Sequence, residues 1–386
     1  MINVLIVFGT RPEAIKMAPL VIEMQKRKDF FKVSVCVTGQ HRQMLDQVLM
    51  LFEISPDYDL DIMAVGQDLY DISSRVLLGM KDIIQKVMPD LVMVHGDTST
   101  STFTSLAAFY AKIPVAHIEA GLRTRNIYSP WPEEINRQIT ARIAHYHFCP
   151  TENNKKNLLS EGILANNIWV TGNTVIDALL ITKYKIDSDV KLRDAVKQQL
   201  LSKGLNIDNY PKERKVILVT GHRRENFGEG FNNICKALKK IALSYNDVDI
   251  VYPVHLNPNV FEPVSSALSE VPNVHLIEPL DYVPFVYLMN VAHIILTDSG
   301  GIQEEAPSLG KPVLVMRDTT ERPESIEGGG VRLVGTDHHK IFNSVVELLK
   351  NQCQYKAMAN TINPYGDGDA AHIITDIIKQ NFINCI

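Results

Sequence analysis

The sequence predicts an α/β protein with two domains, each built on a parallel β-sheet. Short apolar runs of strand length recur along the chain, and longer stretches with helical spacing separate them, which is typical of parallel α/β domains. With 386 residues, 45% of them hydrophobic, the chain is long enough to bury two cores. In each half one strand-like run ends in a turn of the kind that binds anions, so we expect a ligand between the halves.

The expected strands form two series along the chain. The first comprises residues 4–8, 33–37, 91–95, 115–118 and 168–170, and the second comprises 216–219, 249–252, 274–277, 294–297 and 313–316. The segment 181–214 is charged and poor in apolar clusters. Because Val170 to Asn173 is typical of a strand that ends in a turn, we expect a first domain at 1–171 and a second that begins at 172.

The composition limits the kinds of partner. A net charge of −5 and a pI near 6.2 argue against nucleic acid and against an anionic membrane surface. The beginning of the chain has no basic region followed by a long apolar run, and no stretch is apolar for about 18 residues, so we expect a cytoplasmic protein. Five scattered cysteines predict reduced thiols, not disulfides or a zinc site.

Two turns carry the anion-binding signal. The segment Arg11 to Lys16 follows the first expected strand and places cations where a helix begins. Ser299-Gly300-Gly301 follows the run at 294–297, and residues without a β-carbon let backbone N–H groups approach a phosphate. Glu305, one turn later, could accept hydrogen bonds from ribose hydroxyls. Many strand-to-helix turns contain such glycines, so this second signal is weak alone.

Two acids in the first half lie in turns that follow expected strands. Asp97 and Glu119 should lie at the carboxyl ends of neighbouring parallel strands, the edge at which open α/β sheets bind ligands. The alternatives are that Asp97 caps the next helix and that Glu119 pairs with Arg123 or Arg125.

A third acid, Glu133, follows the turn Pro130-Trp131-Pro132 where a helix is expected to begin. Glu133 or Glu134 can also be present only to stabilise the first helical turn through the helix dipole. The catalytic interpretation is favoured because acids at 97, 119 and 133 all lie where one cleft can collect them.

In the second half, the segment Thr220 to Asn226 directly follows the run at 216–219 and contains His222-Arg223-Arg224. A histidine beside two arginines suits a diphosphate, through charge and bidentate hydrogen bonds. The alternative is that the arginines pair with Glu225 or Glu229 at the surface.

Neither a metal nor a nicotinamide cofactor is predicted. Three pairs of residues at positions i and i+2 could ligate zinc or manganese. A histidine at the end of an apolar run, however, is more often a half-buried side chain with its hydrogen bonds satisfied than a metal ligand. The first turn, residues 8–12, lacks the glycine-rich fingerprint of dinucleotide binding, and no later strand is followed by one. The three pairs are His95/Asp97, His117/Glu119 and His145/His147.

These motifs, in their order and spacing, closely resemble the bacterial non-hydrolysing UDP-N-acetylglucosamine 2-epimerases, over nearly the whole chain. The segments that carry the resemblance are 7–16, 96–98, 119–123, 132–134, 221–226, 299–301 and 317–323. The resemblance implies a glycosyltransferase-B-like architecture, in which two Rossmann-like domains face a cleft, the second domain spans 172–365 and a C-terminal helix at 366–386 returns to the first. It also implies a homodimer and no cofactor.

The implied reaction is reversible inversion at C2 of UDP-N-acetylglucosamine, with UDP and 2-acetamidoglucal as intermediates, supplying UDP-N-acetylmannosamine for surface polysaccharides. A hydrolysing epimerase, a retaining glycosyltransferase and a non-catalytic nucleotide-sugar sensor are the alternatives. By the resemblance, Asp97, Glu119, Glu133 and His222 are catalytic. The substrate contacts that it implies are Arg11, Lys16, Asp97, Glu119, His222, Leu280, Phe285, Ser299, Gly300, Gly301, Glu305 and Arg322. Some relatives have glutamine where Leu280 stands, so a uracil contact there must come from the backbone.

Certain members of that family are activated by their own substrate at a neighbouring site. The residues that match it are Gln40, His41, Gln43, Glu134, Arg223 and His255. The stretch 64–67 lacks an arginine that regulated relatives have, so the match to this second site is incomplete.

Overall fold

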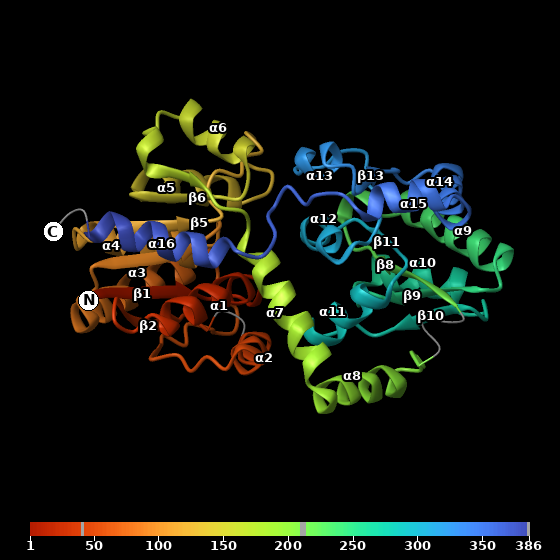
Figure 1. The fold of residues 1–386 in the computed structure, drawn as a ribbon, viewed down its shortest axis with the longest axis horizontal. Helices are drawn as coiled ribbons and strands as arrows, with labels where there is room; N and C mark the ends of the chain where they lie inside the picture. Colours follow the sequence, from red (N-terminus) through yellow and green to blue (C-terminus); the bar gives the residue numbers. More distant parts are fainter. Residues whose placement is uncertain (40–41, 209–213, 384–386) are drawn as a thin grey trace. The chain divides into compact units, whose positions relative to one another are not determined.

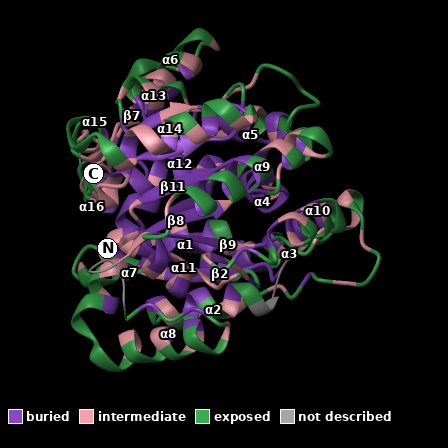
Figure 2. Cartoon of the chain, turned by 90° about the vertical axis from the view of Figure 1, so that its right-hand side faces the viewer, coloured by how far each residue is buried: buried purple, intermediate pink, exposed green. Residues whose placement is uncertain are grey.

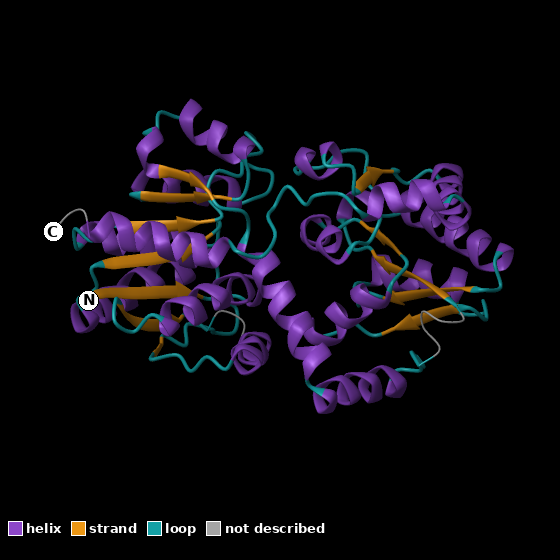
Figure 3. Cartoon of the chain, viewed as in Figure 1, coloured by secondary structure: helices purple, strands orange, loops and turns teal. Residues whose placement is uncertain are grey.

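The computed structural model describes residues 1–39, 42–208 and 214–383, and these form two compact units (Figure 1). The first unit comprises Met1–Ala178 and the segment that begins at Tyr365, and the second comprises Leu179–Pro364. In each unit helices cover a sheet of strands (Figure 3). No helix among these residues is long and apolar enough to cross a membrane.

The first unit contains a seven-stranded parallel sheet in the order β3-β2-β1-β4-β5-β6-β7. The strand order reverses between β1 and β4, which makes this the topological switch point where open α/β sheets bind ligands. The strands are β1 (Ile2–Phe8), β2 (Phe31–Val37), β3 (Tyr58–Asp59), β4 (Leu91–His95), β5 (Val115–Ile118), β6 (Tyr146–Cys149) and β7 (Ile168–Val170).

Local signals explain where the helices of the first unit begin. Capping boxes pair Thr10 with Glu13 and Asp68 with Asp71, and each joins the end of a loop to the first helical turn. The helices are α1 (Arg11–Lys26), α2 (Arg42–Phe52), α3 (Leu69–Val87), α4 (Ser99–Tyr110), α5 (Glu133–Ile143), α6 (Glu152–Ser160), the 3-10 turn Ala165–Asn167, α7 (Thr174–Ser188), which continues into the second unit, and α16 (Ala370–Ile383).

The second unit contains a six-stranded parallel sheet in the order β10-β9-β8-β11-β12-β13, and its order reverses between β8 and β11. Its strands are β8 (Lys215–Thr220), β9 (Val248–Pro253), β10 (Val274–Ile277), β11 (Ile294–Thr297), β12 (Val313–Val315) and β13 (Val331–Leu333). Its helices are α8 (Val190–Ser202), α9 (Glu229–Ser244), α10 (Pro258–Leu268), α11 (Tyr282–Val291), α12 (Gly300–Glu305), α13 (Pro323–Glu327), α14 (His338–Lys350) and α15 (Gln352–Ala359), with 3-10 turns at Arg224–Asn226 and Ala306–Leu309.

The cores lie on both faces of the two sheets, where apolar side chains of the strands pack against the helices. In the first unit Leu5 and Val7 of β1 pack with Val76 and Met80 of α3, and all four are inaccessible to solvent. Figure 2 shows the same pattern in the second unit, whose strands β8, β9 and β11 are buried while α8 and α10 expose one face. The strands stay buried on both faces, as expected for parallel sheets.

The predicted class, two α/β units with parallel sheets, is confirmed, and three strands lie outside the expected runs. In β6 a histidine, His147, interrupts the apolar run, and β3 and β13 have only two and three residues. The charged segment 181–214, which is poor in apolar clusters, contains the end of α7 and all of α8. Val196 and Leu200 of α8 supply a narrow apolar stripe that packs on the second core.

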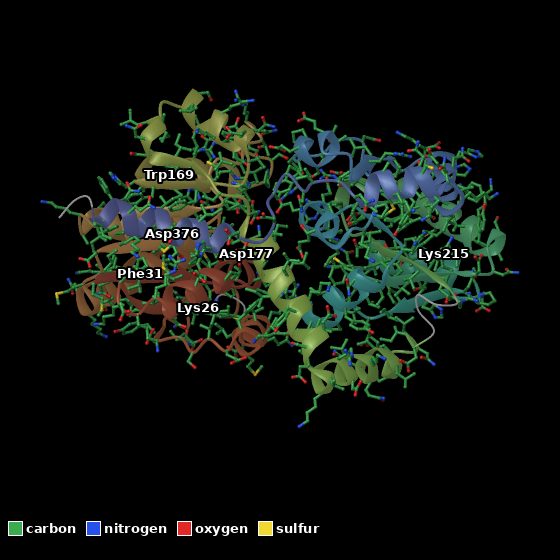
Figure 4. All side chains as sticks on the ribbon, in the orientation of Figure 1. Lys26, Phe31, Trp169, Asp177, Lys215 and Asp376 are labelled. Atoms are coloured by element: carbon green, nitrogen blue, oxygen red, sulfur yellow. The ribbon has the colours of Figure 1, made fainter. Side chains whose placement is uncertain are left out.

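The C-terminal segment completes the first unit. Helix α16 packs on α1, and an ion pair joins Arg27 at the end of α1 to Asp376 of α16. Asp177 of α7 accepts a hydrogen bond of 2.8 Å from the backbone N–H of Ala371 and so caps α16. Figure 4 shows Asp177 on α7 and Asp376 on α16, both in the first unit.

Candidate functional site

Glu119 is the most constrained acid of the first unit. It directly follows β5 and has a positive φ of 60°, a conformation that costs energy for a residue with a β-carbon. Its Oε2 forms an ion pair with Lys16 and accepts a hydrogen bond of 2.7 Å from Asn173 Nδ2, and His95 Nε2 lies 3.7 Å away. The expected alternative pairing with Arg123 is wrong, because Arg123 binds Glu161 instead.

The charge state of Glu119 follows from these neighbours. Burial alone would raise its pKa, but the Coulombic attraction of Lys16 and His95 outweighs this and holds the pKa well below 4.5. Glu119 is therefore a carboxylate at neutral pH and is suited to accept a proton.

Asp97 lies in the turn after β4 and pairs with Arg137 of α5. The expected alternative, that Asp97 caps the next helix, is wrong: the N-cap of α4 is Thr98, whose side chain accepts from the backbone N–H of Ser101. The guanidinium of Arg137 is buried and also lies 3.3 Å from Glu134. Arg137 therefore holds Asp97 at the edge of the sheet, a partnership that sequence reasoning did not anticipate.

The two acids at the beginning of α5 have different surroundings. Glu134 is completely buried and accepts hydrogen bonds from the backbone N–H groups of Thr124 and Arg125 and from Gln138. These donors outweigh burial and lower its pKa below 4.5. In Glu133 the Oε2 atom is buried and has no hydrogen-bond partner among the described residues.

Glu13 is buried and connects two turns of the switch point. It accepts hydrogen bonds from the N–H groups of Gly9 and Thr10 and from the hydroxyls of Thr98 and Ser101. The turns after β1 and β4 are thereby joined, and Arg11 and Lys16 are presented from the first turns of α1. Sequence reasoning named this acid only as part of a motif.

The histidine pairs considered as metal ligands are mostly buried side chains. Burial lowers the pKa of His117 to about 3 and that of His147 to about 4, so both are neutral. His117 Nε2 donates to the carbonyl of Gly96 at 2.7 Å. Within the described parts of the chain, no group of three or more His, Cys, Asp or Glu residues has a geometry that could hold a metal ion.

In the second unit, buried Asp298 organises the turns at the switch point. Its Oδ2 accepts hydrogen bonds of 2.8 Å from the backbone N–H groups of His222 and Arg223, so the turn after β8 is bound to the turn after β11. Its Oδ1 lies 3.5 Å from His222 Nδ1. The alternative was that Arg223 or Arg224 pairs with Glu225 or Glu229; among the described residues Glu225 instead pairs with Arg317.

His222 presents a half-exposed ring beside His255, with the ring centroids 5.7 Å apart. Burial lowers its pKa below 6.5, the charge of Asp298 opposes this, and Arg223 and His255 lower it further. A neutral ring whose Nδ1–H faces Asp298 leaves Nε2 as an acceptor.

The glycine turn is shaped by one close contact. Gly300 begins α12, and a β-carbon built there would lie 2.5 Å from Nη1 of Arg322. Arg322 in turn pairs with buried Glu304. At Gly301 the corresponding β-carbon would be 3.5 Å from Glu305, so a side chain at position 300, but not one at 301, would have to displace the Arg322 guanidinium.

The remaining predicted contacts are distributed as follows. Leu280 precedes α11 and Phe285 lies within it, and both are partly buried against the second core. Ser299, whose N–H donates to the hydroxyl of Thr297, and Glu305 are half-buried at the two ends of α12. Gln40 and His41 lie outside the described residues, as does the side chain of Gln43.

The fold and the site together define a class of protein. Two Rossmann-like units of glycosyltransferase-B-like type each carry polar turns at the switch point of a parallel sheet, one rich in carboxylates and one suited to a diphosphate. A family profile described as UDP-N-acetylglucosamine 2-epimerase matches residues 23–379. The chain belongs to this family of isomerases, and the resemblance to its bacterial non-hydrolysing members is confirmed.

Individual relatives match over almost their full length. The UDP-N-acetylglucosamine 2-epimerase of Escherichia coli (strain K12) is 58% identical over 99% of this chain and 100% of its own. The Neisseria meningitidis enzyme, solved bound to UDP-GlcNAc, has a TM-score of 0.88 and 53% identity over 98% of this chain and 100% of its own. The Methanocaldococcus jannaschii enzyme, solved with UDP-GlcNAc and UDP, has a TM-score of 0.78 and 32% identity over 98% of this chain and 99% of its own.

Proposed function

We propose that this chain interconverts UDP-N-acetylglucosamine and UDP-N-acetylmannosamine by inverting C2, without a metal or cofactor. The ligands of the Neisseria and Methanocaldococcus relatives support the substrate. The observation that carries the proposal is the ionised carboxylate of Glu119, held beside Lys16 at the switch point of the first unit. Such a group is suited to accept a proton from a bound sugar.

The chemistry follows from the position of the hydrogen to be removed. C2 of the sugar is not next to a carbonyl, so its deprotonation alone would leave an unstabilised carbanion. If C2 loses its proton to a base while the C1–O bond to UDP breaks, the electron pair forms a C1=C2 bond, and UDP and 2-acetamidoglucal result. Protonation on the opposite face of C2 and return of a UDP oxygen to C1 give the epimer.

The acids of the first unit supply the proton transfers of this scheme. Glu119 is ionised, Asp97 is held by Arg137, and Glu133 has a buried oxygen without a partner among the described residues. We assign the acid and base roles on the two faces of C2 to these three carboxyl groups.

The turns of the second unit are assigned to the nucleotide. We assign the diphosphate to the backbone N–H groups of Ser299, Gly300 and Gly301, with Arg322 as a donor to the leaving UDP and His222 as a further contact of the substrate. Glu305 is assigned to the ribose, and Phe285 with the backbone of Leu280 to the uracil. These roles come from the resemblance and stay predictions.

A proton NMR time course in heavy water tests the reaction. UDP-N-acetylglucosamine alone should give UDP-N-acetylmannosamine with deuterium at C2 and no free sugar. Epimer without solvent deuterium would contradict elimination and favour internal hydride transfer. Free N-acetylmannosamine would indicate a hydrolysing epimerase, no reaction without an acceptor a glycosyltransferase, and binding alone a sensor.

The same assay tests the acids one at a time. Asp97→Asn, Glu119→Gln and Glu133→Gln keep the shape of each side chain and remove its ionisable group, so turnover should fall by about a hundredfold or more. UDP affinity should change much less. Glu161→Gln is the matched control, because Glu161 pairs with Arg123 in the same unit and has no proposed role. Equal losses of binding and turnover would mean that an acid is structural.

The supply of surface polysaccharide and the homodimer are further parts of this proposal. Both come from the resemblance, and they remain predictions about the cell and the assembly.

A further inference from the structure

Asn173 is a buried polar residue outside the groups assigned above, and its side chain touches a catalytic candidate. It lies in the turn between β7 and α7, and its Nδ2 donates to Glu119 Oε2 at 2.7 Å. Its Oδ1 accepts from the backbone N–H of Val175 at 3.1 Å. Because that contact needs an acceptor, the amide orientation is defined, and the donor end faces Glu119.

The same turn lies against the returning segment of the chain. The backbone N–H of Asn173 donates to the carbonyl of Tyr365 at 2.7 Å. Gly172 and Gly366 both have positive φ, of 81° and 105°, and a β-carbon at Gly172 would lie 2.8 Å from the Tyr365 oxygen. The chain leaves the first unit after Ala178 and returns to it at Tyr365. Asn173 therefore lies close in sequence to the first of these points and is hydrogen-bonded to the second.

The contacts of Glu119 are unequal between its two oxygens. Lys16 from α1, His95 from β4 and Asn173 from the turn before α7 all face Oε2. Lys16 and His95 are the titratable groups that face this carboxylate from the elements packed around it. These three contacts all involve Oε2, so we assign the proton transfer to the other oxygen, Oε1.

We propose that Asn173 is a positioning residue for Glu119. Asn173 orients the Glu119 carboxylate so that Oε1 takes the proton. It also connects this carboxylate to the two chain segments that join the units. This inference rests on the proposed function, in which Glu119 acts on the substrate. Asn173 carries no charge, so it acts through geometry and through stabilising the ionised form of Glu119 by a donated hydrogen bond.

The test uses substitutions that separate the contact with Glu119 from the cap of α7. Asn173→Ser keeps a good N-cap for α7 but cannot reach Glu119. Asn173→Asp keeps the shape and the cap and places a like charge against Glu119. Asn3→Ser is the matched control, because it removes an amide that donates to Val87 O at 2.7 Å at the opposite edge of the same sheet.

In both Asn173 variants kcat should fall by about tenfold or more, while KM changes by less than about twofold, because Asn173 orients the base and does not bind substrate. Losing the donor disfavours the ionised form of Glu119, so the acidic limb of the pH profile of kcat should move to higher pH. The movement should be larger for Asn173→Asp because of the added negative charge. Asn3→Ser should match the wild type both in kcat and in the pH profile of kcat.

Carbon-13 NMR of the glutamate carboxyl groups gives a readout that does not need turnover. With Glu119→Gln to assign the signal, the titration of Glu119 should move to higher pH in Asn173→Ser. If Asn173→Ser lowers Tm, its effect on Glu119 is judged from Asn173→Asp instead, because that variant keeps the cap of α7 and the shape of the side chain. An unchanged carboxyl titration or an unchanged kcat in these variants would overturn the inference. A wild-type chain that fails to epimerise would instead overturn the proposed function, and the carboxyl titration would still test the role of Asn173.

Discussion

Gly300 and Arg322 show how a single missing β-carbon shapes the turn after β11. The guanidinium of Arg322 occupies the space that a side chain at position 300 would need, and it is held there by Glu304. A cation is thus placed at the beginning of α12, beside the N–H groups assigned to the diphosphate. The glycine matters here for close approach, and its φ is not in the left-handed region.

We predict that Gly300→Ala weakens UDP binding by about tenfold or more, because its β-carbon would lie 2.5 Å from Arg322 Nη1 and displace the guanidinium. Isothermal titration with UDP measures the effect. Gly330→Ala is the control: its β-carbon would lie 2.6 Å from the hydroxyl of Thr361, which has no proposed role in UDP binding, so UDP affinity should be unchanged. Equal affinities for both variants would remove Arg322 from the site.

The identities of the candidate site residues could be predicted from the sequence, but their partners could not. Asp97, Glu119 and His222 lie within three residues after strand-like runs, so their place at the sheet edge follows from the period of the chain. The contacts Asp97–Arg137 and Glu119–Asn173 join residues 40 and 54 positions apart. No local pattern encodes such pairs, because they depend on how α5 and α7 pack.

At the scale of elements, most strand positions were predictable from short runs rich in apolar residues. The runs at 91–95, 115–118, 168–170, 274–277 and 294–297 match the observed strands residue for residue. Strand β6 was not predicted, although its run of four residues is similar to that of β5 and each contains one buried, neutral histidine, His147 and His117. Helix α8 was missed because most of its surface is polar, and its apolar stripe is narrow.

Helix α16 depends on a cap from another element, which could not be read from its own sequence. Asp177 of α7 caps it, and the second oxygen of this carboxylate, Oδ2, is buried without a hydrogen-bond partner among the described residues. Burial raises the pKa of Asp177 to about 6 from its ordinary value of 3.8, although backbone N–H groups at the helix end oppose this.

A raised pKa means that the folded state binds the proton more tightly than the unfolded state. Between about pH 4 and pH 6 the folded chain keeps a proton that the unfolded chain has released, so the contribution of Asp177 to stability falls as pH rises through this window. Above it, the buried charge costs up to about 3 kcal/mol.

We therefore predict that Asp177→Asn, which keeps the acceptor for Ala371, raises Tm by a few degrees at pH 7.5 and has little effect at pH 4. Differential scanning calorimetry at the two pH values measures this. Asp189→Asn, an exposed cap of α8, is the matched control and should show no such rise. A lower Tm at pH 7.5 for Asp177→Asn would mean that the attraction between the helix end and the carboxylate exceeds the cost of burial.

At the scale of the whole molecule, the first unit is discontinuous in sequence, whereas the second is one segment, Leu179–Pro364. Helix α16 buries Ile374 and Ile378 in the first unit, and each buried isoleucine contributes roughly 1.5–3 kcal/mol. Because a domain is stable by only about 5–15 kcal/mol, the first unit depends strongly on this helix.

Deletion of residues 366–386 should therefore weaken hydrogen-exchange protection throughout 1–178 and leave 179–364 protected as in the full chain. Exchange measured by mass spectrometry gives protection for each peptide. Truncation after Ile383, which leaves α16 whole, serves as the control. Equal loss in both units would show that they unfold as one, and no loss would show that α16 is dispensable.

The discontinuity of the first unit also determines the order in which the chain can fold during synthesis. Residues 1–178 leave the ribosome first, but α16 and its contacts with Arg27 and Asp177 become available only after 179–364 have been made. At about 5–20 residues per second, this delay lasts roughly 10–40 s. For that time the side of α1 that α16 covers is open to solvent, so the nascent first unit is a substrate for chaperones and proteases until the last helix docks.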